Sequence, residues 1–100
     1  MNNTDAIRRN VDFASNLLKT MGNPHRLLIL CHLSNGELSV GELEKELKLS
    51  QSALSQHLAR LRKQSLVETR RQAQMVYYSL ASAEAAAVID VLCRTLGRTT

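Results

Sequence analysis

The apolar positions from Ser50 to Arg62 repeat with a helical period and leave one polar, basic side. At about 100° per residue, Leu54, Leu58 and Leu61 fall on one side of a helix. The opposite side carries small, amide or cationic side chains, namely Ser52, Gln56, Ala59, Arg60 and Lys63. Ser50 can cap the first turn through its hydroxyl oxygen. The pattern predicts an amphipathic helix whose outer face contains no carboxylate.

The remaining apolar spacing predicts four more helices, over residues 5–20, 23–33, 39–47 and 83–96. Asn23-Pro24 is a cap followed by proline at the first helical position. Ser39 and Glu42 have the spacing of a capping box, and Gly97 is a plausible stop for the last helix. Along the chain, three of these helices precede the one that begins after Ser50, and one follows it.

Two of these segments form a pair. A short helix over 39–47 and a second helix after Ser50 are joined by a tight connection, which matches helix-turn-helix geometry. Residues 66–71 and 75–80 are strand candidates, and Val76, Tyr77 and Tyr78 are good β-formers. We expect a mainly α fold with one small β-hairpin, which is a winged helix-turn-helix.

The outer helix face and the hairpin tip carry the chemistry of nucleic-acid binding. Amide and hydroxyl groups can hydrogen-bond base edges, whereas cations meet phosphates. We expect Ser55 and Gln56 to contact bases, Arg60 and Lys63 to contact phosphates, and the wing to reach the backbone or minor groove. The predicted DNA-binding residues are Ser50, Gln51, Ser52, Ser55, Gln56, His57, Arg60, Lys63, Arg70, Arg71, Gln72 and Gln74.

Charge supports a polyanionic partner. The 100 residues predict a single domain, with 13 cationic and 9 acidic side chains and a net charge of +4. Five of those cations lie in residues 60–71, and this clustering indicates more than the excess itself. The chain lacks an apolar run that could span a membrane and a signal-peptide pattern at its start. We expect a cytoplasmic, nucleoid-associated protein.

Four segments resemble the ArsR family of bacterial repressors, and in particular its thiol-sensing branch that contains HlyU, BigR and SqrR. They are residues 23–31, 37–43, 49–58 and 71–78, within a similarity that covers about residues 17–96. The resemblance implies that the first and last helices pair with their mates across a two-fold axis. A homodimer of this kind presents two helices to successive major grooves of a roughly palindromic operator.

The two cysteines have two interpretations. Cys31 lies in an apolar run and is expected to be a small buried hydrophobe on that basis. The resemblance instead implies a redox- or persulfide-sensing thiol at Cys31, with the second sensing position at Gly97. Cys93 lies one helical turn earlier, a shift of about 6 Å, and a disulfide needs Cα atoms within about 7 Å. Whether Cys31 and Cys93 can bridge stays open at this point.

Other functions are less well supported. The resemblance implies two places for a metal site, because related metal sensors carry a Cys-x-Cys motif in the helix over residues 39–47 and ligands in the last helix. Residues 39–47 contain no Cys and residues 82–96 contain no His, so we expect no metal site and no cofactor. His25, His32 and His57 do not form a ligand cluster by spacing. A small cytosolic thiol redox protein is an alternative, but the chain has no Cys-x-x-Cys. A winged helix used for protein contacts, and an ArsR-type regulator that is not inducible or responds to another ligand, are further alternatives. We expect no catalytic residues.

Overall fold

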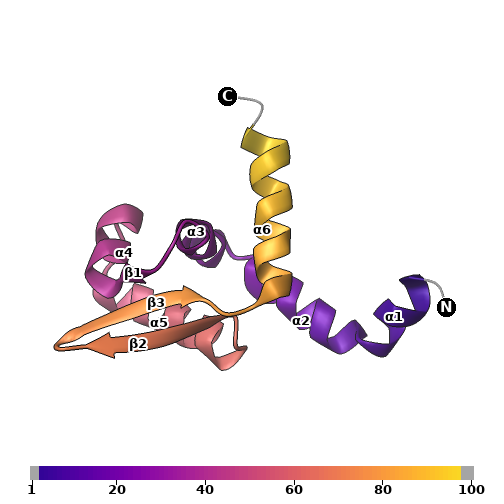
Figure 1. Ribbon diagram of the computed structural model, residues 1–100, viewed down its shortest axis with the longest axis horizontal. Coiled ribbons are helices and arrows are strands. Elements are labelled where there is room, and N and C mark those ends of the chain that lie inside the picture. Colours follow the sequence, from indigo (N-terminus) through magenta and orange to yellow (C-terminus); the bar gives the residue numbers. More distant parts are fainter. Residues whose placement is uncertain (1–2, 98–100) are drawn as a thin grey trace.

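The computed structural model describes residues 3–97 and has the predicted winged helix-turn-helix architecture (Figure 1). A mainly helical chain carries one small antiparallel sheet. Its elements are α1 (Asn3–Arg9), α2 (Val11–Met21), α3 (Pro24–Leu33), β1 (Leu38–Ser39), α4 (Val40–Leu47), α5 (Gln51–Lys63), β2 (Val67–Gln72), β3 (Met75–Leu80) and α6 (Ala83–Leu96).

The first helix differs from the prediction. A single helix over residues 5–20 is wrong, because the chain breaks at Asn10 into α1 and α2. The Asn10 side-chain amide donates to the Ala6 carbonyl oxygen at 2.9 Å, and its backbone N–H donates to Ile7. Asparagine competes in this way with regular helical hydrogen bonds. None of the α1 residues is buried, so packing does not override the local break.

The sheet has one strand more than the hairpin that the sequence predicts. β1 pairs with β3, and the strand order is β1-β3-β2. β1 has only two residues, too few for a recognisable alternation. The first hairpin strand is also displaced by one residue, from 66–71 to Val67–Gln72. The hairpin closes over Ala73 and Gln74, and Ala73 takes a positive φ of 54° that usually favours glycine.

The predicted helix caps are present. The Ser39 hydroxyl oxygen accepts from the Glu42 N–H at 3.1 Å, and the Ser39 N–H donates to Glu42 Oε1 at 2.9 Å. The Ser50 hydroxyl oxygen accepts from the Ala53 N–H and begins α5. Between the two helices, Lys48 adopts the left-handed conformation. The serine caps therefore fix where α4 and α5 begin, and Lys48 marks where α4 ends.

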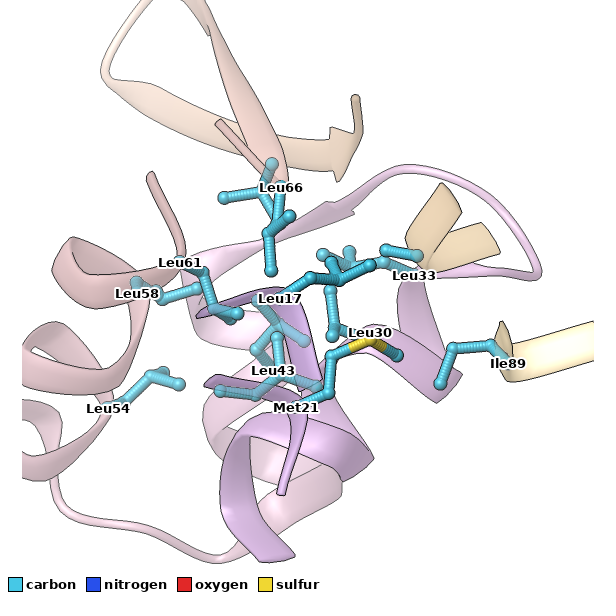
Figure 2. Close-up of a cluster of buried hydrophobic side chains, with 13 residues drawn as sticks. Leu17, Met21, Leu30, Leu33, Leu43, Leu54, Leu58, Leu61, Leu66 and Ile89 are labelled. Carbon is cyan, nitrogen blue, oxygen red and sulfur yellow. The ribbon is translucent and has the colours of Figure 1, made fainter. Parts of the chain in front are cut away.

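A leucine-rich core holds α5 from its inner side (Figure 2). The core draws on every helix except α1 and includes Leu17, Met21, Leu30, Leu33, Leu43, Leu54, Leu58, Leu61, Leu66 and Ile89. The terminal helices contribute only part of their surface to it. In Figure 1, α1 and α2 extend to one side while α6 rises away from the wing.

Candidate nucleic-acid interface

The outer face of α5 lies open to solvent, as the sequence predicts. Leu54, Leu58 and Leu61 are at most 2% exposed and point inward. Of the DNA-binding residues predicted on or beside α5, His57 is half-buried, and the exposed ones are Ser50, Gln51, Ser52, Ser55, Gln56, Arg60 and Lys63. Burial of the leucines therefore fixes the rotation of the helix and turns its polar face outward.

A groove of about 390 Å³ separates α5 from the wing. Its walls come from α5, from the start of α4 and from β3, and they are Val40, Ser55, Leu58, Ala59, Arg62, Lys63 and Tyr78. Arg62 is a cation of this groove that the sequence analysis did not include. The basic run 60–63 contains the signal that could have found it. The groove places two cations, Arg62 and Lys63, on the side of α5 that faces the wing.

Arg70 is engaged within the protein. Its Nε and one terminal nitrogen donate to the two carboxylate oxygens of Glu37 at 2.9 and 2.7 Å. Its other terminal nitrogen donates to Gln72 Oε1 at 2.7 Å, and the guanidinium lies 4.6 Å from the Tyr77 ring centroid. The hydrogen bond with Glu37 raises the pKa of Arg70 and lowers that of Glu37. The ion pair thus ties β2 to the residue before β1.

Arg71 lies on the other face of the hairpin. Side chains alternate between the faces of a strand, and Arg70 pairs with Tyr77 whereas Arg71 pairs with Val76. The face of Arg71 is shared by Tyr78, which lines the groove beside α5. Arg71 is exposed and forms no ion pair within residues 3–97. Gln74 is exposed in the hairpin turn. Arg71 and Gln74 are the wing residues best placed to meet another molecule.

His57 lies on the flank of α5 that faces α3. Its ring centroid is 5.3 Å from that of His25, with the rings tilted by 40°. Burial lowers the pKa of His57, and the nearby His25 and Arg26 lower it further. The imidazole is therefore held toward its neutral form in the free protein.

The structure brings the two cysteines together. Cys31 in α3 is half-buried and Cys93 in α6 is exposed, and both are free thiols. Burial raises the pKa of Cys31, and its electrostatic interaction and hydrogen bond with Cys93 raise it further. The two thiols therefore interact despite the one-turn displacement noted in the sequence, and both are free. Cys93 also lines a pocket of about 290 Å³ with Ser34, Asn35, Leu80, Ala86, Ile89 and Asp90.

Large apolar side chains remain exposed on the terminal helices. On α1 and α2 they are Ile7, Val11, Phe13 and Leu18, and on α6 they are Val91 and Leu96. The outer side of α6 has a shallow hollow whose lining is entirely apolar, made by Ala87, Val88, Val91 and Leu92. Exposed apolar patches of this kind mark surfaces that contact another molecule.

Comparison with known proteins identifies the family. Residues 23–69 match the bacterial regulatory proteins of the arsR family. The chain is 54% identical over 92 residues to the transcriptional activator HlyU of Vibrio cholerae, a match covering 92% of this chain and 85% of HlyU. The chain belongs to the ArsR family. Its members are DNA-binding transcriptional regulators, so this ArsR-family chain is a regulator and not a thiol enzyme.

Two solved structures of ArsR-family regulators share this fold. Reduced HlyU from Vibrio cholerae superposes with a TM-score of 0.86 at 54% identity, covering 90% of this chain and 95% of HlyU. The transcriptional repressor BigR from Xylella fastidiosa gives a TM-score of 0.87 at 40% identity, covering 95% and 96% of the two chains. The chain thus lies in the HlyU and BigR branch, as the resemblance implies.

In the part of the chain that the structure describes, no group of three or more His, Cys, Asp or Glu side chains is placed to bind a metal ion. Over the same residues 3–97, the helices are too short or too polar to span a bilayer.

Proposed function

We propose that this ArsR-family regulator is a repressor that binds a palindromic operator as a homodimer. The observation that carries the proposal is the exposed, carboxylate-free face of α5, held outward by three buried leucines. An α-helix fits the major groove, where amide side chains can distinguish base pairs. The DNA-binding class is established by the family, whereas the operator symmetry and the residue roles belong to the proposal.

We assign different roles to the polar residues. Ser55 and Gln56 contact base edges, with Ser50, Gln51 and Ser52 beside them at the start of the helix. Arg60 and Lys63 contact phosphates, and Arg62 joins them as the further cation of the groove. Arg71 and Gln74 reach DNA from the wing. Arg70 and Gln72 reach it only when the Glu37 ion pair opens, so in the closed pair they stiffen the wing.

The homodimer forms through the terminal helices. The apolar side chains left exposed on α1, α2 and α6 are more than one small domain can cover, and a second copy of the chain covers them most simply. The dimer doubles the net charge from +4 to +8, which strengthens attraction to DNA. It also presents two α5 helices related by a two-fold axis, which matches a palindromic site.

The base contact predicts a loss of sequence preference. Gln56→Ala should weaken operator binding by about 1–3 kcal/mol, the usual range for a lost base contact, and should leave unrelated DNA unaffected. Lys63→Ala should weaken binding to all DNA sequences about equally. It should also reduce the slope of log affinity against log salt concentration by about one per subunit, because one phosphate contact is lost. Fluorescence anisotropy in a salt titration, with duplexes of the chain's own upstream DNA and of scrambled DNA, measures both effects. A Gln56→Ala protein with full operator preference contradicts the assigned face.

We further propose that the regulator is released from DNA by oxidation or persulfide chemistry at Cys31 and Cys93. The support is the interaction between the two thiols, because Cys31 lies in α3, which packs behind the helix-turn-helix, and Cys93 lies in α6, which carries part of the exposed apolar surface. A disulfide forms when the two thiols give up two electrons and two protons to an oxidant. With a persulfide donor, one thiolate takes a sulfur and releases the donor's thiol, and the second thiolate then displaces hydrosulfide.

The thiol switch predicts an inducer response that needs both cysteines. Persulfide donors should lower operator affinity, and Cys31→Ser or Cys93→Ser should abolish the response. Because thiolates are the nucleophiles and the pKa of Cys31 is raised, the reaction should accelerate as the pH rises above neutral. Gel shift and intact mass, measured on the same sample before and after treatment, check this. A double Ser variant that is still fully inducible contradicts the switch and favours an ArsR-type regulator with another ligand.

A further inference from the structure

Four basic side chains gather on the flank of α5 that faces α3. His25 and Arg26 come from the first turn of α3, His57 comes from the middle of α5, and Arg60 comes from its last turn. The two imidazole rings lie 5.3 Å apart between their centroids. Arg26 acts electrostatically on His57, and Arg60 acts on Arg26. We call these four residues the flank cluster.

The flank cluster lies opposite the wing. Ser55, Ala59 and Arg62 line the groove on the wing side of α5. His57 is two residues after Ser55, which places it about 200° further round the helix. A helix inserted in the major groove has a sugar-phosphate strand on each side. The wing and the groove cations face one of these strands, so the flank cluster faces the other.

The cluster contains positive charge without a balancing acid. Within residues 3–97, none of its four members forms an ion pair with a carboxylate. Arg26 is fixed in place because its Nε donates to the Thr20 carbonyl oxygen at 2.7 Å. An anion can bind here, because a fixed guanidinium, a second arginine and two adjacent imidazoles place several donors close together.

We propose that the flank cluster binds one phosphate of the DNA backbone and that the His25–His57 pair takes up a proton when it does so. The proposal rests on the DNA-binding function and deepens it, because it adds His25 and Arg26 to the contact surface. It also makes operator affinity dependent on pH. The phosphate belongs to the strand on the α3 side of the major groove.

The direction of the pH effect follows from the neighbours of His57. In the free protein, burial, His25 and Arg26 lower the pKa of His57 and favour the neutral ring. The charged residues of β2, which also contacts α5, are Glu68, Arg70 and Arg71, and they lie on the wing side. A phosphate anion stabilises the imidazolium and raises the pKa again. DNA binding therefore takes up protons, and affinity increases as the pH falls.

The experiment measures operator affinity at two pH values and constant salt. Between about pH 8 and about pH 6, wild type should gain roughly tenfold in affinity, as expected when one imidazole per subunit is protonated on binding. His25→Gln and His57→Gln should reduce this gain to less than about twofold, because an amide of similar size cannot be protonated. His32→Gln is the matched control, since His32 is a half-buried histidine at the other end of α3. It should keep the full gain.

A second measurement locates the phosphate. Single phosphates along each half-site are replaced, one at a time, by neutral methylphosphonates. Only the replacement at one position, on the strand facing α3, should abolish the pH dependence of operator affinity. Retention of the full pH effect in the His25→Gln/His57→Gln double variant, or at every methylphosphonate position, would overturn the proposal. Specific binding that does not change with pH overturns this inference alone. Absence of binding to the upstream duplex at either pH overturns the proposed operator function as well.

Discussion

Reversing the charge of Arg71 should abolish specific DNA binding while leaving the domain folded. Arg71 is exposed, forms no ion pair within residues 3–97 and shares a hairpin face with Tyr78 of the α5 groove. In Arg71→Glu, a like charge replaces an attractive contact near phosphate, which typically costs several kcal/mol in an interface. With two wings per dimer, we expect operator affinity to fall at least about 100-fold. Anisotropy titration at low salt measures the loss.

The matched control places the same change of charge elsewhere. Arg94→Glu reverses an exposed arginine in the last turn of α6, and this helix rises away from the wing in Figure 1. It replaces a solvent-exposed ion pair with Asp90 by a like-charge pair at the same i,i+4 spacing, and each of these changes has only a small effect on stability. Both variants should retain the wild-type thermal unfolding midpoint, and only Arg71→Glu should lose binding. If Arg71→Glu binds the operator tightly, the wing has no part in the contact.

Short-range rules account for most of the fold. The caps at Ser39 and Ser50 and the leucine spacing of α5 are local features, and the structure has them as predicted. The break at Asn10 was missed because its hydrogen bond to Ala6 competes with a helix that the apolar spacing alone supports. β1 was missed because a two-residue strand exists only through its pairing with β3. Pattern analysis contains no such long-range information.

The candidate site also has features that local sequence predicts and features that depend on tertiary packing. The outer face of α5 could be predicted, because burial of one side determines exposure of the other. The contacts that distinguish residues within the site could not. Glu37 and Arg70 are 33 residues apart in sequence, and the Cys31–Cys93 and His25–His57 contacts depend on how α6 and α5 cross α3. Sequence supplies the residue types, and tertiary packing decides which of them are available to DNA.

A charge on the outer side of α6 should prevent the proposed homodimer from forming and with it remove operator binding. Val91 is half exposed and lines the apolar hollow with Ala87, Val88 and Leu92. In a dimer, Val91→Asp would bury a carboxylate without a partner, which is strongly unfavourable. We expect a monomer in sedimentation velocity at micromolar concentration. Because the second half-site contact is then no longer intramolecular, operator affinity should fall by roughly 10²–10⁴-fold.

Ala83→Asp provides the comparison for this variant. It adds the same charge to the same helix, at an exposed first position where an acid suits the helix N-terminus. We expect that variant to remain dimeric and to bind the operator, and both proteins to keep wild-type helicity by circular dichroism. Val91→Ala should fall between them, because it shortens the apolar contact without adding charge. A Val91→Asp protein that is still a dimer with full operator affinity would exclude this side of α6 from the dimer interface, and the exposed apolar residues of α1 and α2 would then have to form it.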